Sequence, residues 1–376
     1  MLLSDLGADV VVVGGGRAGV PIPDLSRGKS FISLDLHTDE GRAALHALVK
    51  RADVLVEGFR PGVAARIGAG YKELSAINTR LIYCSLTGYG QYGPRNQEAG
   101  HDINYLAISG ILAALGPADR PPTPPLNLVA DFAGGSLFAV FGIASALYER
   151  ERSGRGQLVD VAMVDGCLSM MAMHFPLWKT DVIPARGQGL FAAPYYRTYE
   201  CADGKFVAVG ALERSFFEAL WAGLGLSDPP DHFDQGQWPD IERTLEAAFQ
   251  KKDRDTWAAV FRGSDACVTP VLEPDEVVTD AQFQSRHRAI DTPVPVAPRF
   301  GRTPGRAGTV DLADSTGNVL AKAGVGADVI ARLAVDRSNK NRTGLDWPPR
   351  FKNANKRHTS GERHEGHGPG RLRTVS

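Results

Sequence analysis

The sequence predicts an α/β protein with a large domain built on a parallel sheet and a smaller α+β domain. Two observations predict the parallel sheet: short apolar runs typical of buried strands alternate with helical stretches, and those strands close in glycine-bearing loops. A third observation predicts the second domain, because the pattern changes near Pro194 to that of an antiparallel hairpin. At 376 residues the chain is long enough for both domains.

The parallel sheet is expected to begin with four strands, at residues 10–13, 31–36, 54–56 and 81–86. Thr38 follows the second strand and is a good N-cap for the next helix, whose first turn holds Asp39 and Glu40. Ligands of such a sheet bind beyond the carboxyl ends of its strands, so we expect the functional site there.

The remaining expected elements are helices and one hairpin. An apolar, alanine-rich helix over residues 137–148 is expected to be buried, and a second helix is expected over 159–173. The hairpin joins residues 195–201 to 205–210 through a turn at Asp203-Gly204. Amphipathic helices follow near residues 215–224 and 240–249.

These elements divide the chain into domains. We expect a large domain over residues 1–189 that about 301–338 complete, and a small domain over 190–300. The segment 339–376 is rich in Arg, Lys, His and Gly and has few apolar residues, so we expect it to be disordered.

Composition excludes several classes of partner. Lys and Arg number 42 against 43 Asp and Glu, so no global field draws the chain to nucleic acid or to a membrane, and any anion site must be local. No apolar run approaches membrane-spanning length, and no signal-peptide core is present. The four cysteines lack CxxC spacing, which fits a reducing compartment. We therefore expect a cytoplasmic protein without a metal site.

One familiar motif is present but is rejected. Residues 14–19 read GGGRAG after a strand, which fits the dinucleotide-binding pattern G-x-G-x-x-G. That pattern requires its last glycine to open a helix, and here Pro21 and Pro23 disfavour one. No G-x-S-x-G or H-E-x-x-H pattern supports a hydrolase.

Two stretches carry the chemistry: GHDINY at residues 100–105 and PPLNLVADFAGGS at residues 124–136. They contain His101 and Asp131. Each has glycines or small residues nearby, which let a ligand approach the backbone closely. Each lies beside an expected helix start, where free N–H groups can stabilise a developing oxyanion. Taken alone, His101 could be a structural histidine and Asp131 a helix N-cap.

Together with APYYRTYECADGKFVAVGALE and SDACVTPVL, these stretches resemble the family III CoA-transferase superfamily, of the CaiB/BaiF type. Within it the chain is most similar to the α-methylacyl-CoA racemases, and the resemblance runs from about Leu3 to Leu333. It implies that His101 and Asp131 are the catalytic pair and that Glu213 hydrogen-bonds the catalytic histidine. The residues then expected at the substrate or CoA are Arg17, Glu57, Arg66, Gly100, Tyr105, Asn127 and Gly134.

The implied reaction inverts the α-carbon of 2-methyl-branched acyl-CoA thioesters by a two-base 1,1-proton transfer. One base removes the weakly acidic α-proton from one face while an acid returns a proton on the other. For this, Asp131 needs a raised pKa, which we expect Leu128 and Phe132 to provide by burying it. No metal or redox cofactor is expected, because CoA is part of the substrate.

The resemblance also implies an architecture, a Rossmann-like large domain in an interlocked homodimer. The active site would lie between the large domain of one chain and the small domain of its partner, so that Glu213 would reach His101 across the interface. Relatives carry a further N-terminal strand, so we expect the large domain to be N-terminally truncated.

Two alternative functions stay open. In a family III CoA-transferase Asp131 would be a nucleophile, and a mobile glycine run ending in Gln would cover the site; the nearest match, Arg186-Gly187-Gln188-Gly189, is short. The other alternative is an inactive, truncated paralogue.

Overall fold

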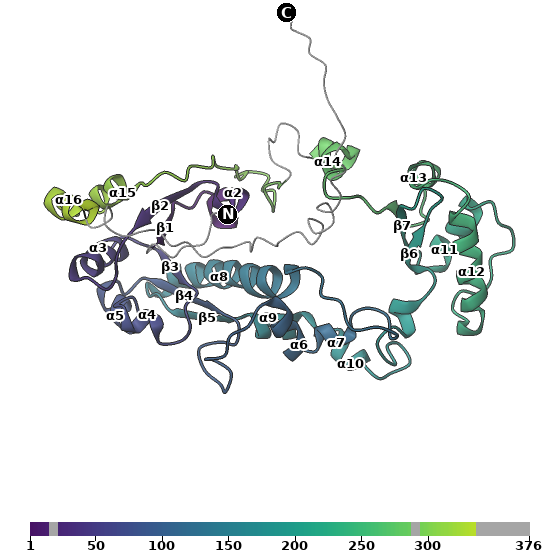
Figure 1. Ribbon diagram of the computed structural model, residues 1–376, viewed down its shortest axis with the longest axis horizontal. Coiled ribbons are helices and arrows are strands. Elements are labelled where there is room, and N and C mark those ends of the chain that lie inside the picture. The colour runs from purple at the N-terminus through teal and green to yellow at the C-terminus, as the bar shows by residue number, and fades with distance from the viewer. Residues whose placement is uncertain (15–21, 287–293, 336–376) are drawn as a thin grey trace, which may run out of the picture.

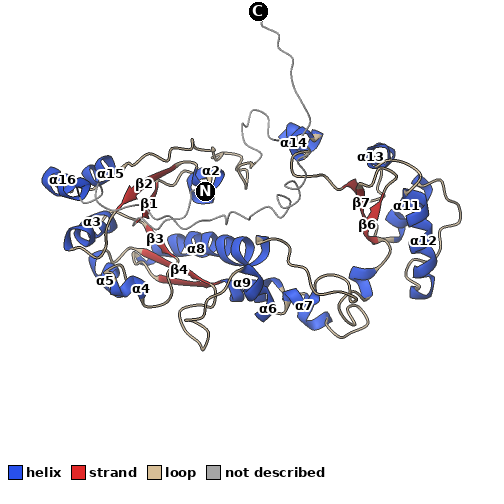
Figure 2. Cartoon of the chain, viewed as in Figure 1, coloured by secondary structure: helices blue, strands red, loops and turns tan. Residues whose placement is uncertain are grey.

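The computed structural model describes residues 1–14, 22–286 and 294–335. These residues form a mixed α/β structure, with parallel strands towards one end and an antiparallel sheet with its helices at the other (Figures 1 and 2). Two predictions fall outside the described residues: Arg17 as a CoA contact, and disorder of the segment 339–376.

The N-terminal elements form a two-stranded parallel sheet with three helices. They are α1 (Leu2–Asp5), β1 (Val10–Gly14), α2 (Pro23–Ser26), β2 (Lys29–Ser33) and α3 (Asp39–Val49). Strand β2 begins and ends earlier than predicted, because its register pairs Lys29 with Val10 and Ser33 with Gly14. Thr38 caps α3 as predicted, since its Oγ1 accepts the N–H of Gly41 at 3.1 Å.

A second parallel sheet, in the order β3–β4–β5, follows. Its strands and the helices between them are β3 (Val54–Glu57), α4 (Val63–Arg66), α5 (Tyr71–Ile77), β4 (Ile82–Thr87) and β5 (Leu158–Ala162). The predicted helix over 159–173 is wrong in its first part: α9 (Met163–Met170) begins only after β5. The β-branched Val159 and Val161 pair instead with Cys84 and Leu86 of β4.

The parallel strands therefore belong to two sheets and not to one continuous sheet. In the part of the chain that the structure describes, β1 pairs only with β2, and β3 pairs only with β4. The two sheets still share one apolar core, to which Val11 of β1 and Leu55 of β3 both contribute. Apolar side chains on these two edge strands are exposed, Val13 to 37% and Val56 to 51%.

A long helical stretch joins β4 to β5 through α6 (Asp102–Ile108), α7 (Ile111–Ala114), the π-helix η1 (Leu128–Leu137) and α8 (Phe138–Ser153). Helix α8 packs on β4 and β5, while α6 and α9 pack on η1. The prediction that α8 is buried is wrong in part, because Phe141 is 71% and Tyr148 64% exposed.

By length and composition alone, the helical stretch Leu128–Ser153 could cross a membrane, which the sequence analysis did not expect. It packs against two strands and two further helices of the same α/β unit. One side of this stretch therefore packs within the unit, while Phe141 and Tyr148 on it remain exposed.

The antiparallel sheet has the order β6–β7–β8 and confirms the predicted hairpin and both amphipathic helices. Helix α10 (His174–Leu177) comes before this region and lies near α7 (Figure 1). The elements of the region are η2 (Gly189–Ala192), β6 (Tyr196–Glu200), β7 (Phe206–Gly210), α11 (Arg214–Gly223), η3 (Gln235–Gln237), α12 (Trp238–Phe249), α13 (Arg254–Phe261) and β8 (Val268–Pro270). Its helices and strands enclose an aromatic-rich core that includes Tyr199, Phe217, Phe249 and Trp257.

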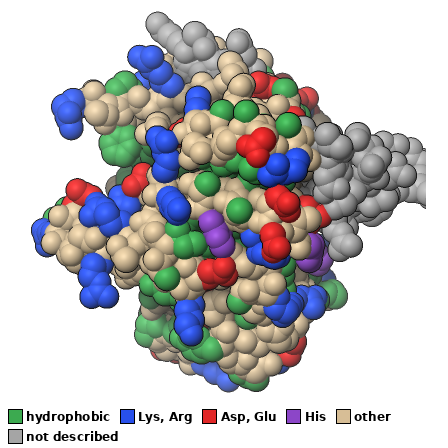
Figure 3. All heavy atoms as spheres, turned by 90° about the vertical axis from the view of Figure 1, so that its left-hand side faces the viewer, with side chains coloured by type: hydrophobic (Ala, Val, Ile, Leu, Met, Phe, Trp, Pro, Cys, Tyr) green, Lys and Arg blue, Asp and Glu red, His purple; other side chains and the backbone are tan. Residues whose placement is uncertain are grey.

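The last described elements lead back to the N-terminal sheet. They are η4 (Val277–Thr279), α14 (Ala281–Arg286), α15 (Thr316–Lys322) and α16 (Ala327–Val335). Helix α15 packs on β2 and α3, and the Oγ1 of Thr316 accepts the N–H of Ser33 at 3.0 Å. On this end of the molecule, basic and acidic side chains are interspersed, without a patch of one sign (Figure 3).

Candidate active site

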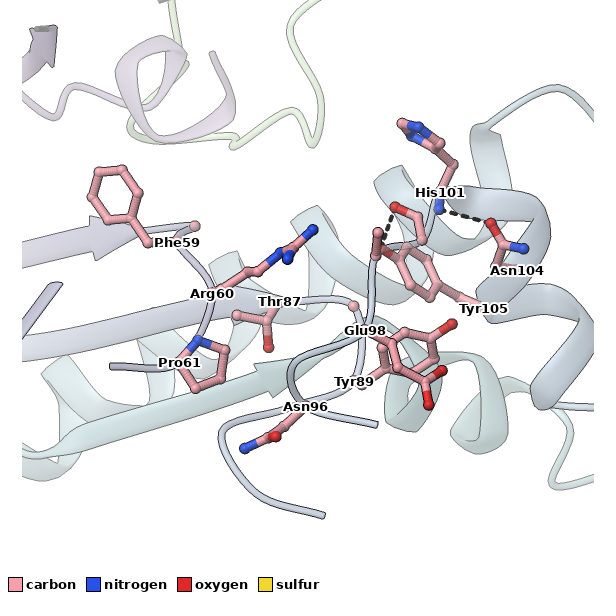
Figure 4. Close-up of a pocket in the computed structure, with 14 residues that line it drawn as sticks. Phe59, Arg60, Pro61, Thr87, Tyr89, Asn96, Glu98, His101, Asn104 and Tyr105 are labelled. Carbon is pink, nitrogen blue, oxygen red and sulfur yellow. Dashed lines mark hydrogen bonds between the residues drawn. The ribbon is translucent and has the colours of Figure 1, made fainter. Parts of the chain in front are cut away.

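A cavity of about 590 Å³ opens beyond the carboxyl ends of β3 and β4, where the parallel topology predicts ligands. Its walls come from the loops after these strands and from the start of α6 (Figure 4). The lining residues are Gly58, Phe59, Arg60, Pro61, Thr87, Gly88, Tyr89, Asn96, Glu98, Ala99, Gly100, His101, Asn104 and Tyr105.

His101 lies at the N-cap of α6 and is exposed. Its backbone N–H donates to Oδ1 of Asn104 at 3.0 Å, and its imidazole points away from Asn96 and Glu98 (Figure 4). The hydroxyl of Tyr105 donates to the carbonyl of Gly100 at 2.7 Å. A Cβ on Gly100 would lie 2.7 Å from the Tyr105 ring, so only glycine fits this close approach. These contacts fix the segment that presents His101 to the cavity.

Asp131 lies in the first turns of η1 and is half-buried. Burial raises the pKa of its carboxyl. The hydrogen bond from Nδ2 of Asn127 to Oδ2, at 3.2 Å, lowers this pKa, the charge of Asp102 raises it and His101 lowers it. The structure thus brings His101 and Asp131 within electrostatic reach of each other. Leu128 and Phe132, which were predicted to bury Asp131, are themselves 54% and 37% exposed.

The raised pKa of Asp131 predicts a change in stability with pH. The folded chain binds the Asp131 proton more tightly than the unfolded chain does. Ionisation of Asp131 therefore lowers the free energy of unfolding once the pH exceeds the pKa of the unfolded chain. The loss is complete above the pKa of the folded chain. Asparagine cannot ionise, so the difference in free energy of unfolding between Asp131→Asn and the parent chain should move in favour of the variant as the pH rises from about 4 to about 7. Urea melts at several pH values measure this difference. A difference that stays constant over this range would contradict the prediction.

The structure also identifies Arg60, which the sequence analysis missed. It is the one Lys or Arg side chain among the described residues that line the cavity. Figure 4 shows it reaching from the loop after β3 into the space between Phe59 and His101. Arg60 lies in the stretch VEGFRPG, residues 56–62, which also contains Glu57. Arg66 and Glu57 themselves are not among the lining residues: Arg66 ends α4 and is exposed, and Oε2 of Glu57 accepts the N–H of Phe59 at 2.8 Å.

Two of the predicted residues have roles other than lining the cavity. Gly134 is buried where η1 crosses α9, and a Cβ there would lie 3.0 Å from the Met163 carbonyl and 3.2 Å from the Cys167 amide nitrogen. It therefore allows close packing of these helices. Asn127 contacts the Asp131 carboxyl directly. Among the described residues, no group of three or more His, Cys, Asp or Glu side chains is placed to hold a metal ion.

The model of CoA-transferase family III matches residues 1–329. The chain belongs to CoA-transferase family III.

Its family III relatives include the α-methylacyl-CoA racemase of Mus musculus, 40% identical over 90% of this chain and 92% of the relative. The α-methylacyl-CoA racemase of Homo sapiens is 39% identical over 92% of this chain and 94% of the relative. A solved structure of a CaiB/BaiF family protein from Brucella suis superimposes with a TM-score of 0.73 at 27% identity, covering 86% of this chain and 94% of that chain.

Within this family III chain, Glu213 does not lie beside His101. Glu213 is the N-cap of α11, which lies in the antiparallel region at one end of the molecule, while α6 lies nearer its middle (Figure 1). In the antiparallel region, burial raises the pKa of the Cys267 thiol, and the charge of Glu213 raises it further. A role for Glu213 at His101 therefore requires a second chain.

Proposed function

We propose that this family III chain is a racemase that inverts the α-carbon of 2-methyl-branched acyl-CoA thioesters by a two-base 1,1-proton transfer. The observation that carries the proposal is that η1, which holds Asp131, packs on α6, whose start places His101 on the rim of the cavity. Burial raises the pKa of the Asp131 carboxyl. The racemases of mouse and human among the relatives support the same reaction.

The chemistry follows from these two groups. A neutral ring nitrogen of His101 removes the α-proton, and the electron pair of the C–H bond moves to the thioester carbonyl to give an enolate. The protonated Asp131 then delivers its proton to the opposite face of the α-carbon, and the roles exchange for the other epimer. The raised pKa favours the protonated form that this step needs. N–H groups at the start of α6 are suited to stabilise the enolate oxygen.

The substrate supplies its own CoA, so the reaction needs no cofactor. We place the CoA near Arg60, whose guanidinium can pair with a phosphate. Arg66, Glu57 and Arg17 are further proposed contacts.

The working unit is proposed to be an interlocked homodimer, in which Glu213 of the partner subunit orients His101. The exposed Phe141 and Tyr148 on α8 offer apolar surface for such a contact. The cysteines Cys84, Cys167, Cys201 and Cys267 are free thiols, which supports a reducing compartment such as the cytosol.

The reaction is tested by incubating the chain with one epimer of a 2-methylacyl-CoA in D2O. We expect deuterium to enter the α-position, followed by NMR, with loss of stereochemical purity, followed by chiral analysis. His101→Ala and Asp131→Asn should abolish inversion, while His37→Ala and Asp119→Asn, which replace exposed residues outside the cavity, should preserve it. Transfer of CoA to an added carboxylate without exchange would identify a CoA-transferase with Asp131 as nucleophile. A folded chain with neither activity would be an inactive paralogue.

A further inference from the structure

One carboxylate outside the cavity lining joins the two elements that carry the proposed bases. Asp102 is the first residue of α6, directly after His101, and is 4% exposed. Its Oδ2 accepts the N–H of Ala130 at 2.7 Å and the N–H of Asp131 at 2.9 Å. A single side chain beside one base therefore holds the backbone of the other.

The position of these hydrogen bonds in the helix explains their strength. The first N–H groups of a helix have no partner within the helix, and η1 leaves those of Ala130 and Asp131 to an outside acceptor. An ionised carboxylate binds such donors more strongly than a neutral oxygen does, and it also stabilises the positive end of the helix. The start of η1 is thus tied to the start of α6.

The environment of Asp102 shows that this arrangement has a cost. Its Oδ1 is buried without a hydrogen-bond partner in the described part of the chain, and no salt bridge to Asp102 forms among the described residues. A buried carboxylate with only two donors loses hydration that these donors only partly replace. A residue chosen for stability alone would avoid this cost.

We propose that Asp102 is a positioning residue that holds η1 against α6 and so sets the placement of Asp131 relative to His101. The inference rests on the proposed racemase function, because inversion requires the two bases on opposite faces of one carbon. Displacement of one base by about 1 Å can lower the rate about 100-fold. Asp102 is not among the residues that line the cavity, so in this proposal it acts only through the two bases.

The charge of Asp102 adds a second, separable effect. It opposes ionisation of Asp131, and its removal should lower the pKa of Asp131. The other titratable or charged groups around this pair are His101 and Tyr105 of α6, Cys167 of α9, and Arg60, which acts on Tyr105. All of these groups remain in an Asp102→Asn variant.

The first experiment uses Asp102→Asn in the full chain, because asparagine keeps an acceptor oxygen and loses the charge. We expect kcat for epimerisation to fall by about 10- to 100-fold, with KM within about threefold of the parent value. With the epimer for which Asp131 is the base, the acidic limb of the kcat/KM profile reports protonation of Asp131, and it should move to lower pH by up to about one unit. An unchanged pH profile would overturn the electrostatic part of the proposal, and an unchanged kcat would overturn the positioning part.

The second experiment does not depend on activity. In Asp102→Ala we expect backbone amides of the peptide containing residues 128–133 to exchange with D2O about tenfold faster, measured by hydrogen-exchange mass spectrometry. Exchange at the parent rate would overturn the inference even if the chain proved to have no racemase activity. If Asp102→Ala does not fold, the same peptide in Asp102→Asn decides the question.

The matched control for both experiments is Asp253→Asn. Asp253 caps α13 in the antiparallel region, where its Oδ1 accepts the N–H of Thr256. It should leave the pH profile and the exchange of residues 128–133 unchanged. If Asp253→Asn changed the pH profile or the exchange of residues 128–133, loss of any helix-capping carboxylate would have the same effect. That result would overturn a specific role for Asp102.

Discussion

In His101→Ala we expect α-proton exchange to fall by about 10²–10⁴-fold for one epimer of the substrate and to persist for the other. The epimer whose α-proton faces Asp131 still meets a base, which can return a deuteron to the same face. This epimer should therefore exchange with retention of configuration. The opposite epimer presents its proton to the missing imidazole and should not exchange.

The Asp131→Asn variant should show the opposite preference, since it keeps His101 and loses the other base. The measurement is deuterium content and chiral purity of each epimer after incubation in D2O, with unchanged far-UV circular dichroism as the control for folding. Equal loss of exchange for both epimers in each variant would mean that the two residues act on the same face, which is incompatible with inversion by two bases.

Gly166→Ala is expected to cause the second large effect, on stability and activity together. A Cβ on Gly166 of α9 would lie 2.0 Å from the backbone carbonyl oxygen of Gly134 in η1. Neither atom belongs to a flexible side chain, so α9 and η1 must separate. Overpacking of this kind costs about 1–3 kcal/mol of folding free energy, and it also displaces the helix that carries Asp131.

The measurement is the free energy of unfolding from urea melts together with kcat. Gly210→Ala is the matched control, because a Cβ on Gly210 meets nothing within 4 Å and its backbone is not left-handed. We expect the control to change stability by less than about 1 kcal/mol. A Gly166→Ala chain as stable as this control would show that the crossing of α9 and η1 is not tightly packed.

Much of the fold could be predicted because each signal was local. The strands near residues 10–13, 54–56 and 81–86 are short apolar runs with clear ends, and the hairpin has its turn residues between two alternating runs. Strand β5 was missed because Leu158–Ala162 passes directly into α9, and periodicity cannot separate a short strand from a helix that follows without a turn. The division of the parallel strands into two sheets depends on tertiary pairing, which no local pattern encodes.

The candidate site shows the same division between local and distant information. His101, Gly100 and Tyr105 line the cavity from one continuous motif, so the motif was enough to place them together. The link between Asp102 and the Asp131 amide joins residues 29 apart in sequence, and only the folded chain shows it. The motifs alone do not fix the position of Glu213 relative to His101, and the fold of one chain does not bring the two residues together.

The open edges of β1 and β3 have a consequence for handling the protein. Within the described part of the chain, each strand has a hydrogen-bonded neighbour on one side only, although both lie over the shared core. Unpaired edges with apolar side chains such as Val13 and Val56 are templates for strands of other molecules. Losses from solution should then rise steeply with protein concentration while the chains remain folded, so dilution would protect the sample better than cooling.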